Sequence, residues 1–428
     1  MRLNPWQLPA AALLLWTSTC AFAENWPSWR GVRNDGISHE KNLPAEFGPE
    51  KNFAWKVRLP GPAGSTPVVW GDHIFLTSVN DAGDLLLMAL DSSGKELWQR
   101  KVSSGNKNVR SDEGNSASNS PVTDGKFVWS MMADGMLACF DFAGNEIWKV
   151  DLQERYGKFT IQFGMTSTPV YDEGVLYLQL IHGEGEAATR EACVVALEGA
   201  TGKQIWRVDR PSDAYAENEH SYASPIIYQD DQRKYLLTHG ADYVIAHRLN
   251  DGSEIWRCGE LNRKGNYDAT LRFVSSPVAV PGLIVVPTAK RGPVLALRPD
   301  GQGTITEKSE FHVWDWKKTP DVPSPLIDGN LVYLCMENGD LHVLEAATGK
   351  EVYIQRTERD RHRASPVLAD GKLYLCARNG VVTVVKTGRE FEVLATNNLG
   401  EDISSSPAIA NGTLYLRTYQ HLWAFRQK

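Results

Sequence analysis

The sequence predicts an all-β fold, an eight-bladed β-propeller made of four-stranded antiparallel blades. Three observations predict it: a Ser/Thr-Pro step that recurs eight times, an apolar hairpin after most of these steps, and a repeated Gly-x-x-x-Trp pattern. The prolines of the step lie 41 to 56 residues apart, at Pro67, Pro121, Pro169, Pro225, Pro277, Pro325, Pro366 and Pro407. Helical repeats of this length need amphipathic helices, a pattern that the sequence does not show, so each unit is interpreted as a propeller blade.

The first two strands of each blade are predicted from the residues after the Ser/Thr-Pro step. A polar turn with glycine leads into an apolar run, as in Gly174-Val-Leu-Tyr-Leu and Gly371-Lys-Leu-Tyr-Leu. A turn of this kind between two apolar runs favours a β-hairpin. A third strand follows, for example over residues 87–91 and 193–197.

The fourth strand carries an aromatic residue four positions after a glycine, in five copies with the same spacing. Trp314 and Phe391 stand at the corresponding place in less regular copies. A flat ring at one equivalent position per blade fills the wedge between neighbouring sheets, and an indole N–H finds a backbone acceptor there. We therefore predict that one aromatic residue per blade has a structural docking role: Trp55, Trp98, Trp148, Trp206, Trp256, Trp314, Tyr353 and Phe391.

The last unit ends after residues 422–425 without such a fourth strand. The segment Asn52-Phe-Ala-Trp55-Lys-Val has the sequence of the missing strand but precedes the first Ser/Thr-Pro step. We expect this N-terminal strand to complete the final blade and close the ring, which removes two exposed sheet edges. Residues 52–428 are then the propeller, and residues 24–51 a segment that packs on it.

Residues 1–23 are interpreted as a secretory signal peptide. Arg2 precedes an apolar stretch over residues 8–16, and Ala21-Phe-Ala23 matches a cleavage site. We expect cleavage after Ala23 and export to the periplasm or the cell surface. Lipidation at Cys20 is disfavoured by the preceding residues Thr17-Ser-Thr19. No transmembrane segment is expected in the mature chain, because no later stretch has the ~20 apolar residues that span a bilayer.

The charge and the cysteines exclude several classes of function. Lys+Arg 45 against Asp+Glu 52 gives a net charge of -7, without the basic excess that binds nucleic acid. The cysteines after Cys20 are odd in number and form no C-x-x-C motif, so a zinc site is unsupported. We expect small buried core residues, with a disulfide as the alternative, for Cys139, Cys193, Cys258, Cys335 and Cys376.

The repeated elements resemble the pyrroloquinoline quinone (PQQ) repeat over nearly all of residues 52–428. Copies of its last element include Thr201-Gly-Lys-Gln-Ile-Trp206 and Thr348-Gly-Lys-Glu-Val-Tyr353. The N-terminal Trp26-Pro-Ser-Trp29-Arg-Gly31 is similar to secreted bacterial PQQ-repeat propellers. The resemblance implies one of two functions. The BamB branch lacks a cofactor and works through protein contacts, whereas quinoprotein dehydrogenases hold PQQ and a metal ion.

The segments just before the Ser/Thr-Pro steps are expected to lead into the mouth of the central channel. Their polar residues are candidates for a cofactor site: Asn119, Glu219, His220, Arg272, Arg361, Arg363 and Asp402. Oxygens of Asn119, Glu219 and Asp402 suit a cation such as Ca²⁺. The three arginines suit the carboxylates of an anionic quinone. The interpretation we favour is a set of hydrated loop charges around a wet channel, so we predict that Glu219→Ala folds normally.

The sequence lacks the features of a complete enzyme. It has no adjacent cysteine pair and no long insertions, and it has no nucleophile elbow, H-E-x-x-H or Walker motif. We therefore predict no catalytic or metal-binding residues, no cofactor, and an exported, monomeric propeller that binds a protein partner in the cell envelope. The alternative is a PQQ-dependent alcohol or sugar dehydrogenase that uses PQQ with Ca²⁺.

Overall fold

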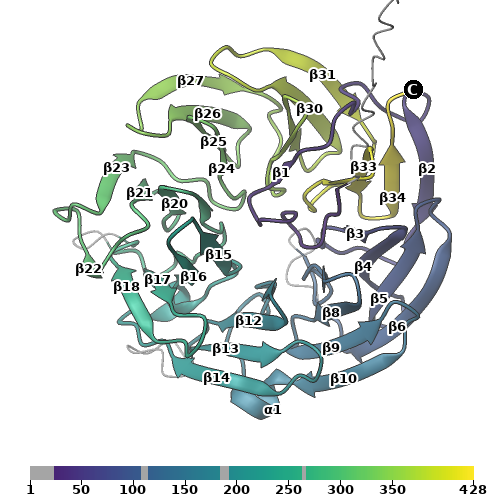
Figure 1. Cartoon of the computed structure of the whole chain (residues 1–428). Helices are drawn as coiled ribbons and strands as arrows, with labels where there is room; N and C mark the ends of the chain where they lie inside the picture. Colours follow the sequence, from purple (N-terminus) through teal and green to yellow (C-terminus); the bar gives the residue numbers. More distant parts are fainter. Residues whose placement is uncertain (1–23, 108–113, 184–191, 263–266) are drawn as a thin grey trace, which may run out of the picture.

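A computed structural model describes residues 24–107, 114–183, 192–262 and 267–428. Eight sheets, each with four antiparallel strands, are arranged in a ring, which confirms the predicted eight-bladed propeller (Figure 1). The predicted signal peptide, including Cys20, lies outside the described residues. Within the described ranges, no helix has the length and apolar character needed to cross a membrane.

In blades 1 to 7 the chain runs from the innermost strand to the outermost. Blades 1 to 4 are formed by β3 (Val68–Trp70), β4 (His73–Val79), β5 (Asp84–Asp91) and β6 (Glu96–Ser104); β7 (Val122–Thr123), β8 (Phe127–Met131), β9 (Met136–Asp141) and β10 (Glu146–Asp151); β11 (Val170–Asp172), β12 (Val175–Leu180), β13 (Cys193–Glu198) and β14 (Gln204–Asp209); β15 (Ile226–Gln229), β16 (Lys234–Gly240), β17 (Tyr243–His247) and β18 (Glu254–Cys258).

Blades 5 to 8 follow the same order around the ring. Their strands are β19 (Val278–Val280), β20 (Leu283–Pro287), β21 (Val294–Leu297) and β23 (His312–Trp316); β24 (Leu326–Asp328), β25 (Leu331–Cys335), β26 (Asp340–Glu345) and β27 (Glu351–Arg356); β28 (Val367–Ala369), β29 (Lys372–Cys376), β30 (Val381–Lys386) and β31 (Val393–Asn398); β32 (Ala408–Ala410), β33 (Thr413–Arg417), β34 (His421–Phe425) and β2 (Phe53–Arg58).

Four short elements lie outside this plan. β22 (Gly303–Ile305) adds a parallel fifth strand to blade 4, and β1 (Ile37–Ser38) adds one to blade 7. The helix α1 (Leu152–Tyr156) and the 3₁₀ turn η1 (Ala216–Glu219) lie in the connections after blades 2 and 3.

The ring is closed by β2, as predicted. This N-terminal strand pairs antiparallel with β34, with Trp55 opposite Ala424. A buried side chain adds a second link, because Arg417 of blade 8 donates to the carbonyl oxygen of Thr77 in blade 1 at 2.6 Å. The last blade is therefore built from both ends of the described chain.

The docking aromatics explain the Gly-x-x-x-Trp pattern. Indole N–H groups donate at 2.8 Å to carbonyls of the next blade from Trp55, Trp98, Trp148, Trp206 and Trp314. The ring of Trp55 covers Gly94, where a Cβ would lie 2.8 Å from the indole. The glycine of one copy thus makes room for the tryptophan of the preceding blade. Trp256 packs in the same way against Gly301.

Phe391 is a correction. The strand register places Ala395, opposite Val384, at the docking position of blade 7, because the turn before β31, closed by Lys386 N and Glu392 O, is longer than the Asp91–Lys95 turn of blade 1. Phe391 lies before β31 and instead receives Tyr353 of blade 6, with ring centroids 5.8 Å apart. The irregular spacing after Gly388 hid this shift.

The Ser/Thr-Pro steps form a hydrogen-bonded belt around the channel. A residue before proline is held extended, so its N–H points along the ring toward the next blade. Seven links of 2.8 to 3.4 Å join the backbone N–H of one blade to the hydroxyl of the next. The belt consists of Thr66, Ser120, Thr168, Ser224, Ser276, Ser324, Ser365 and Ser406.

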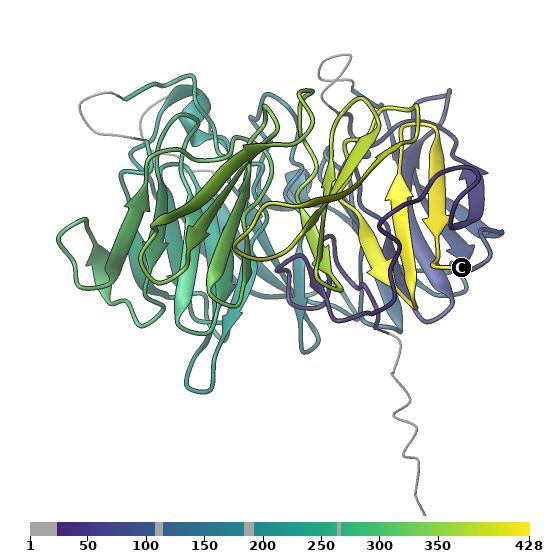
Figure 2. The ribbon, with the colours of Figure 1, turned by 90° about the horizontal axis from the view of Figure 1, so that it is seen from above.

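The two faces of the disc differ (Figure 2). We call the face with the hairpin turns between the first two strands of each blade the turn face, and the face with the connections between blades the loop face. Residues 24–47 run across the turn face. They bind blade 1 through the Trp26–Val69 bridge, blade 6 through Arg30 and blade 7 through β1.

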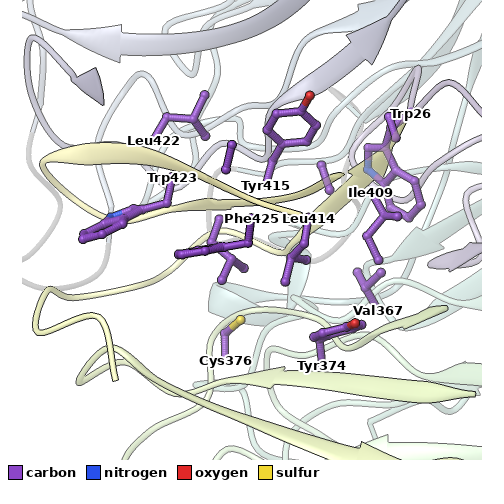
Figure 3. Close-up of a cluster of buried hydrophobic side chains, with 14 of the residues drawn as sticks. Trp26, Val367, Tyr374, Cys376, Ile409, Leu414, Tyr415, Leu422, Trp423 and Phe425 are labelled. Carbon is purple, nitrogen blue, oxygen red and sulfur yellow. The ribbon is translucent and has the colours of Figure 1, made fainter. Parts of the chain in front are cut away.

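The core lies between neighbouring sheets. Figure 3 shows part of the cluster that joins blades 7, 8 and 1, in which Tyr374 and Cys376 lie near Leu414 and Phe425, with Trp26 added from the N-terminal segment. All five described cysteines are buried and unbridged, which confirms the core interpretation. Burial raises the pKa of Cys139 to about 12, so this thiol stays protonated.

Candidate functional site: the channel and its loop-face mouth

The belt encloses a cavity of about 360 Å³ on the propeller axis. All eight belt hydroxyls line it, and Trp29 of the N-terminal segment lines it from the turn face. Each linked hydroxyl accepts a backbone N–H, which leaves its own hydrogen as a donor. The cavity wall is therefore polar and rich in hydroxyl groups.

The cavity continues into a groove at the loop face, with a volume of about 660 Å³. Its walls come from the connections and turns of blades 5 to 7. We call it the basic groove, because most of its charged side chains are cationic: Arg272, Lys290, Arg291, Lys318, Arg359, Arg361 and Arg363, with the acidic Asp321 and Glu337. Arg272, Lys290, Asp321 and Arg363 line both spaces.

Arg272 stands where the groove meets the cavity. Its guanidinium donates to Glu217 at 2.6 Å and lies 4.3 Å from the centre of the Phe163 ring. Phe163 in turn packs against Tyr222, at 5.8 Å between centroids. Burial raises the pKa of Tyr222, which remains a neutral phenol. This aromatic support holds the Arg272 guanidinium in one place.

Arg361 and Arg363 flank a buried histidine. His362 forms an isolated bridge with Ala377, and its backbone N–H donates to the Glu337 carbonyl at 2.8 Å. Side chains alternate along an extended segment, so both arginines face the groove while His362 faces the core. Burial lowers the pKa of His362, which keeps the imidazole neutral beside these cations.

The acidic residues of the groove hold Lys290 and Arg363 in place. Lys290 pairs with Asp321 at 2.5 Å and Glu337 at 3.3 Å, and Arg363 pairs with Glu337 at 3.4 Å. Burial alone would lower the pKa of Lys290, but the bond to Asp321 and the two carboxylate charges outweigh it and raise that pKa. The lysine therefore stays charged.

The predicted site residues separate into two groups. Arg272, Arg361 and Arg363 lie together in the groove. His220 is not part of the lining; burial lowers its pKa.

The predicted cation ligands do not converge, which corrects the cation site. Asn119 is buried and donates to the carbonyls of Met165 and Ser167. Glu219 is fully buried and faces Gly183 from the end of η1. Asp402 faces Arg378 at 3.3 Å. The prediction that Glu219→Ala folds normally assumed a hydrated side chain, and this assumption is wrong.

These residues fit only half of a quinone site. Three arginines suit the carboxylates of PQQ, but the oxygens expected for Ca²⁺ point into different blades. In the described part of the chain, no group of three or more His, Cys, Asp or Glu is placed to hold a metal ion. The donor set therefore does not fit the metal of the alternative function.

The sequence analysis missed Lys290, Arg291 and Arg359. It considered only the segments just before the Ser/Thr-Pro steps, whereas Lys290 and Arg291 lie in the turn after β20. The run Lys290-Arg291-Gly292 at the end of a strand was the sequence feature that could have indicated these cations. The turn between the second and third strands reaches the same face as the connections between blades.

Fold and belt together define a class, the PQQ-repeat β-propellers. A family model described as outer membrane protein assembly factor BamB matches residues 133–309 and 304–428. The chain therefore belongs to this family.

Relatives with known names point in two directions. A polyvinylalcohol dehydrogenase of Pseudomonas sp. is 26% identical over 200 residues, which is 43% of this chain and only 29% of that protein. BamB of Moraxella catarrhalis has a TM-score of 0.61 at 12% identity, over 87% of this chain and 97% of its own. A europium-containing methanol dehydrogenase has a TM-score of 0.71 at 12% identity, over 94% and 98%. Both structural likenesses show the fold alone.

Proposed function

We propose that the protein is an exported, non-catalytic propeller that binds a partner protein at its loop face in the cell envelope. The observation that carries this proposal is the loop-face mouth. It combines a large, charged groove with a donor set that lacks converging metal ligands. Membership of the BamB family supports the same function.

The turn face is the poorer candidate for partner binding. Residues 24–47 already cover its centre with backbone hydrogen bonds to several blades, including Trp26 N to Val69 O at 2.8 Å. The groove at the loop face has Lys318, Arg359 and Arg361 as exposed side chains. A partner can contact these without displacing part of the fold.

The predicted signal cleavage is compatible with the start of the folded segment. The backbone nitrogen of Glu24 lies 2.7 Å from a carboxylate oxygen of Glu40. Cleavage after Ala23 would make this nitrogen an α-ammonium group, and the contact would become charge-assisted. Mass spectrometry of protein purified from the envelope should give Glu24 as the first residue; an intact Met1 would contradict export by cleavage.

Site-specific photocrosslinking in the producing cell tests the platform function. A photoreactive residue is placed at Arg359 on the loop face or, as the matched control, at Asp231 on the turn face. We expect one discrete crosslinked protein from position 359 and none from position 231. Absence of a product at both positions, or a product only at position 231, would contradict the proposal.

The alternative function, a PQQ-dependent dehydrogenase, is favoured by one observation, the grouping of Arg272, Arg361 and Arg363 at the channel. Calorimetric titration with PQQ, with and without Ca²⁺, distinguishes the two functions. We expect no binding at micromolar concentrations. Tight, Ca²⁺-dependent binding would establish the alternative.

A further inference from the structure

The charge of the basic groove is opposite to that of the whole chain. Seven cationic and two acidic side chains line it, a balance of +5, whereas the chain carries -7. Neighbouring carboxylates such as Glu217 and Asp268 offset part of this charge from outside the lining. The concave shape and the excess of positive charge focus the electrostatic potential at the mouth of the channel.

Two of the cations, and the backbone of a third, are held in position before any ligand binds. Arg272 is held by Glu217 and the Phe163 ring, and Lys290 by its two carboxylates. The backbone around Arg361 is bound on both sides, because its carbonyl accepts from Arg378 N at 2.7 Å while His362 N donates to blade 6. A preorganised site loses little conformational entropy on binding.

The cations are spread over a length and not gathered at a point. They come from three blades and two kinds of loop, so a single small carboxylate can contact only a few of them. An extended polypeptide presents alternate side chains about 7 Å apart on one face. Such a chain can place several carboxylates along the groove at once.

The adjoining cavity suits one terminal or side-chain carboxylate. Ser276, Ser324 and Ser365 of the belt line this cavity, as do Arg363 and Lys290. The only acidic side chain among the described lining residues is Asp321, which pairs with Lys290. The serine hydroxyl hydrogens and the two cations are the donors that a carboxylate accepts. The groove and the cavity therefore select the same chemical group.

Single-stranded nucleic acid fits this groove less well. Such ligands stack their bases on aromatic side chains, and the described lining of the groove contains none. The repelling charge of the whole chain also acts on a long polyanion.

We propose that the basic groove binds an extended, carboxylate-rich segment of the partner protein. This inference rests on the proposed function and specifies its partner: the segment lies along blades 5 to 7, with one carboxylate directed into the hydroxyl-lined cavity. Binding is electrostatic, and salt weakens it.

A labelled peptide tests the inference on the mature protein. The peptide has about twelve residues, alternating Glu and Ser, and is about 40 Å long when extended. The control peptide has Gln in place of Glu. Fluorescence anisotropy should show binding of the Glu peptide that weakens with added salt, and no binding of the Gln peptide. Failure of the Glu peptide to bind at low salt would overturn the inference.

Two triple variants locate the binding. We expect Lys318→Gln with Arg359→Gln and Arg361→Gln to weaken binding at least about tenfold, since all three exposed charges line the groove. The matched control, Lys95→Gln with Lys203→Gln and Lys350→Gln, removes the same charge from exposed outer turns and should change binding less than about twofold. Equal losses in both would show nonspecific attraction and overturn the inference.

Competitors separate the chemical classes. Citrate at the same carboxylate concentration, or an oligothymidylate, should displace the peptide poorly; displacement as effective as by unlabelled peptide would overturn the assignment to a polypeptide. If crosslinking identifies a loop-face partner but the Glu peptide does not bind, this inference fails and the proposed function stands. If the Glu peptide binds but no partner is crosslinked, the proposed function fails.

Discussion

The two ends of the channel are built from the same eight repeats but carry opposite charge. At the turn face, a cavity of about 800 Å³ is lined by six aspartates, Asp35, Asp172, Asp230, Asp231, Asp328 and Asp370, against Arg33 and Lys41. At the loop face, the basic groove has seven cations against two acids. One ring thus presents two chemically different surfaces.

The aspartates of the turn face have structural partners. Asp230 accepts from the backbone N–H of Gln232 and Arg233, Asp370 accepts from Leu43 N, and Asp35 accepts from Ile37 N. These bonds shape turns and attach the N-terminal segment. The comparison teaches that aspartates of the turn face serve the fold, whereas the loop face carries an excess of cations, for which we propose a binding role.

The largest expected effect is on the turn face. Trp26 is fully buried in the cluster that joins blades 7, 8 and 1, so Trp26→Ala should lower the free energy of unfolding by about 3–5 kcal/mol. Urea denaturation measures this loss, and the variant should keep its affinity for the Glu peptide. A loss below about 1 kcal/mol would mean that the N-terminal segment does not contribute to the core.

The second-largest effect is a loss of folding stability at acidic pH, caused by the buried His239. Burial lowers its pKa to about 3, and one ring nitrogen bonds to the Pro287 carbonyl at 2.8 Å. The unfolded chain takes up this proton below about pH 6.5 and the folded chain does not, so stability is lost as the pH falls through 6.5 toward 3. Between pH 7 and 5 we expect a loss of about 2 kcal/mol from this residue.

The variant His239→Gln tests that pH dependence. Its stability at pH 7 should be lower than that of the wild type, but the further loss between pH 7 and 5 should be smaller. Denaturant unfolding at both pH values gives the comparison. The same loss on acidification in both proteins would show that His239 does not take up a proton on unfolding.

A smaller effect is expected for one link of the belt. Ser276→Ala removes the acceptor of Ser224 N, which is bonded at 2.8 Å, and should cost about 1 kcal/mol. Ser93→Ala, in an exposed turn, is the matched control and should cost less. Equal stability of Ser276→Ala and the wild type would show that this hydrogen bond of the belt does not contribute to the free energy of unfolding.

The smallest effect on stability should come from the groove variant with Gln at positions 318, 359 and 361. These side chains are exposed, so the free energy of unfolding should change by less than about 0.5 kcal/mol, although peptide binding falls. Thermal unfolding measures the difference. A large loss of stability would mean that the groove cations serve the fold, as the aspartates of the turn face do.

The sequence alone predicted the architecture because the blade is a local, repeated unit. The Ser/Thr-Pro step recurs in every copy, and the hairpin glycines and docking tryptophans recur in most copies. Each of these residues predicts a local contact within or between blades. Ring closure was predicted because the last repeat lacks a fourth strand and the segment around Trp55 supplies one. The prediction for Phe391 was wrong because a longer turn before β31 moves the docking position to Ala395.

The candidate site was predicted only in part, because it depends on the direction of side chains in irregular connections. Glu219 and Arg272 both precede a Ser/Thr-Pro step, yet η1 turns Glu219 into the protein while the Phe163 ring holds Arg272 at the channel. Lys290 joins the site from a turn that is remote in sequence from Arg361. The repeat determines which blades are neighbours. The packing of the irregular connections decides which charged side chains come together, because each of these contacts occurs only once in the ring and therefore leaves no repeated pattern in the sequence.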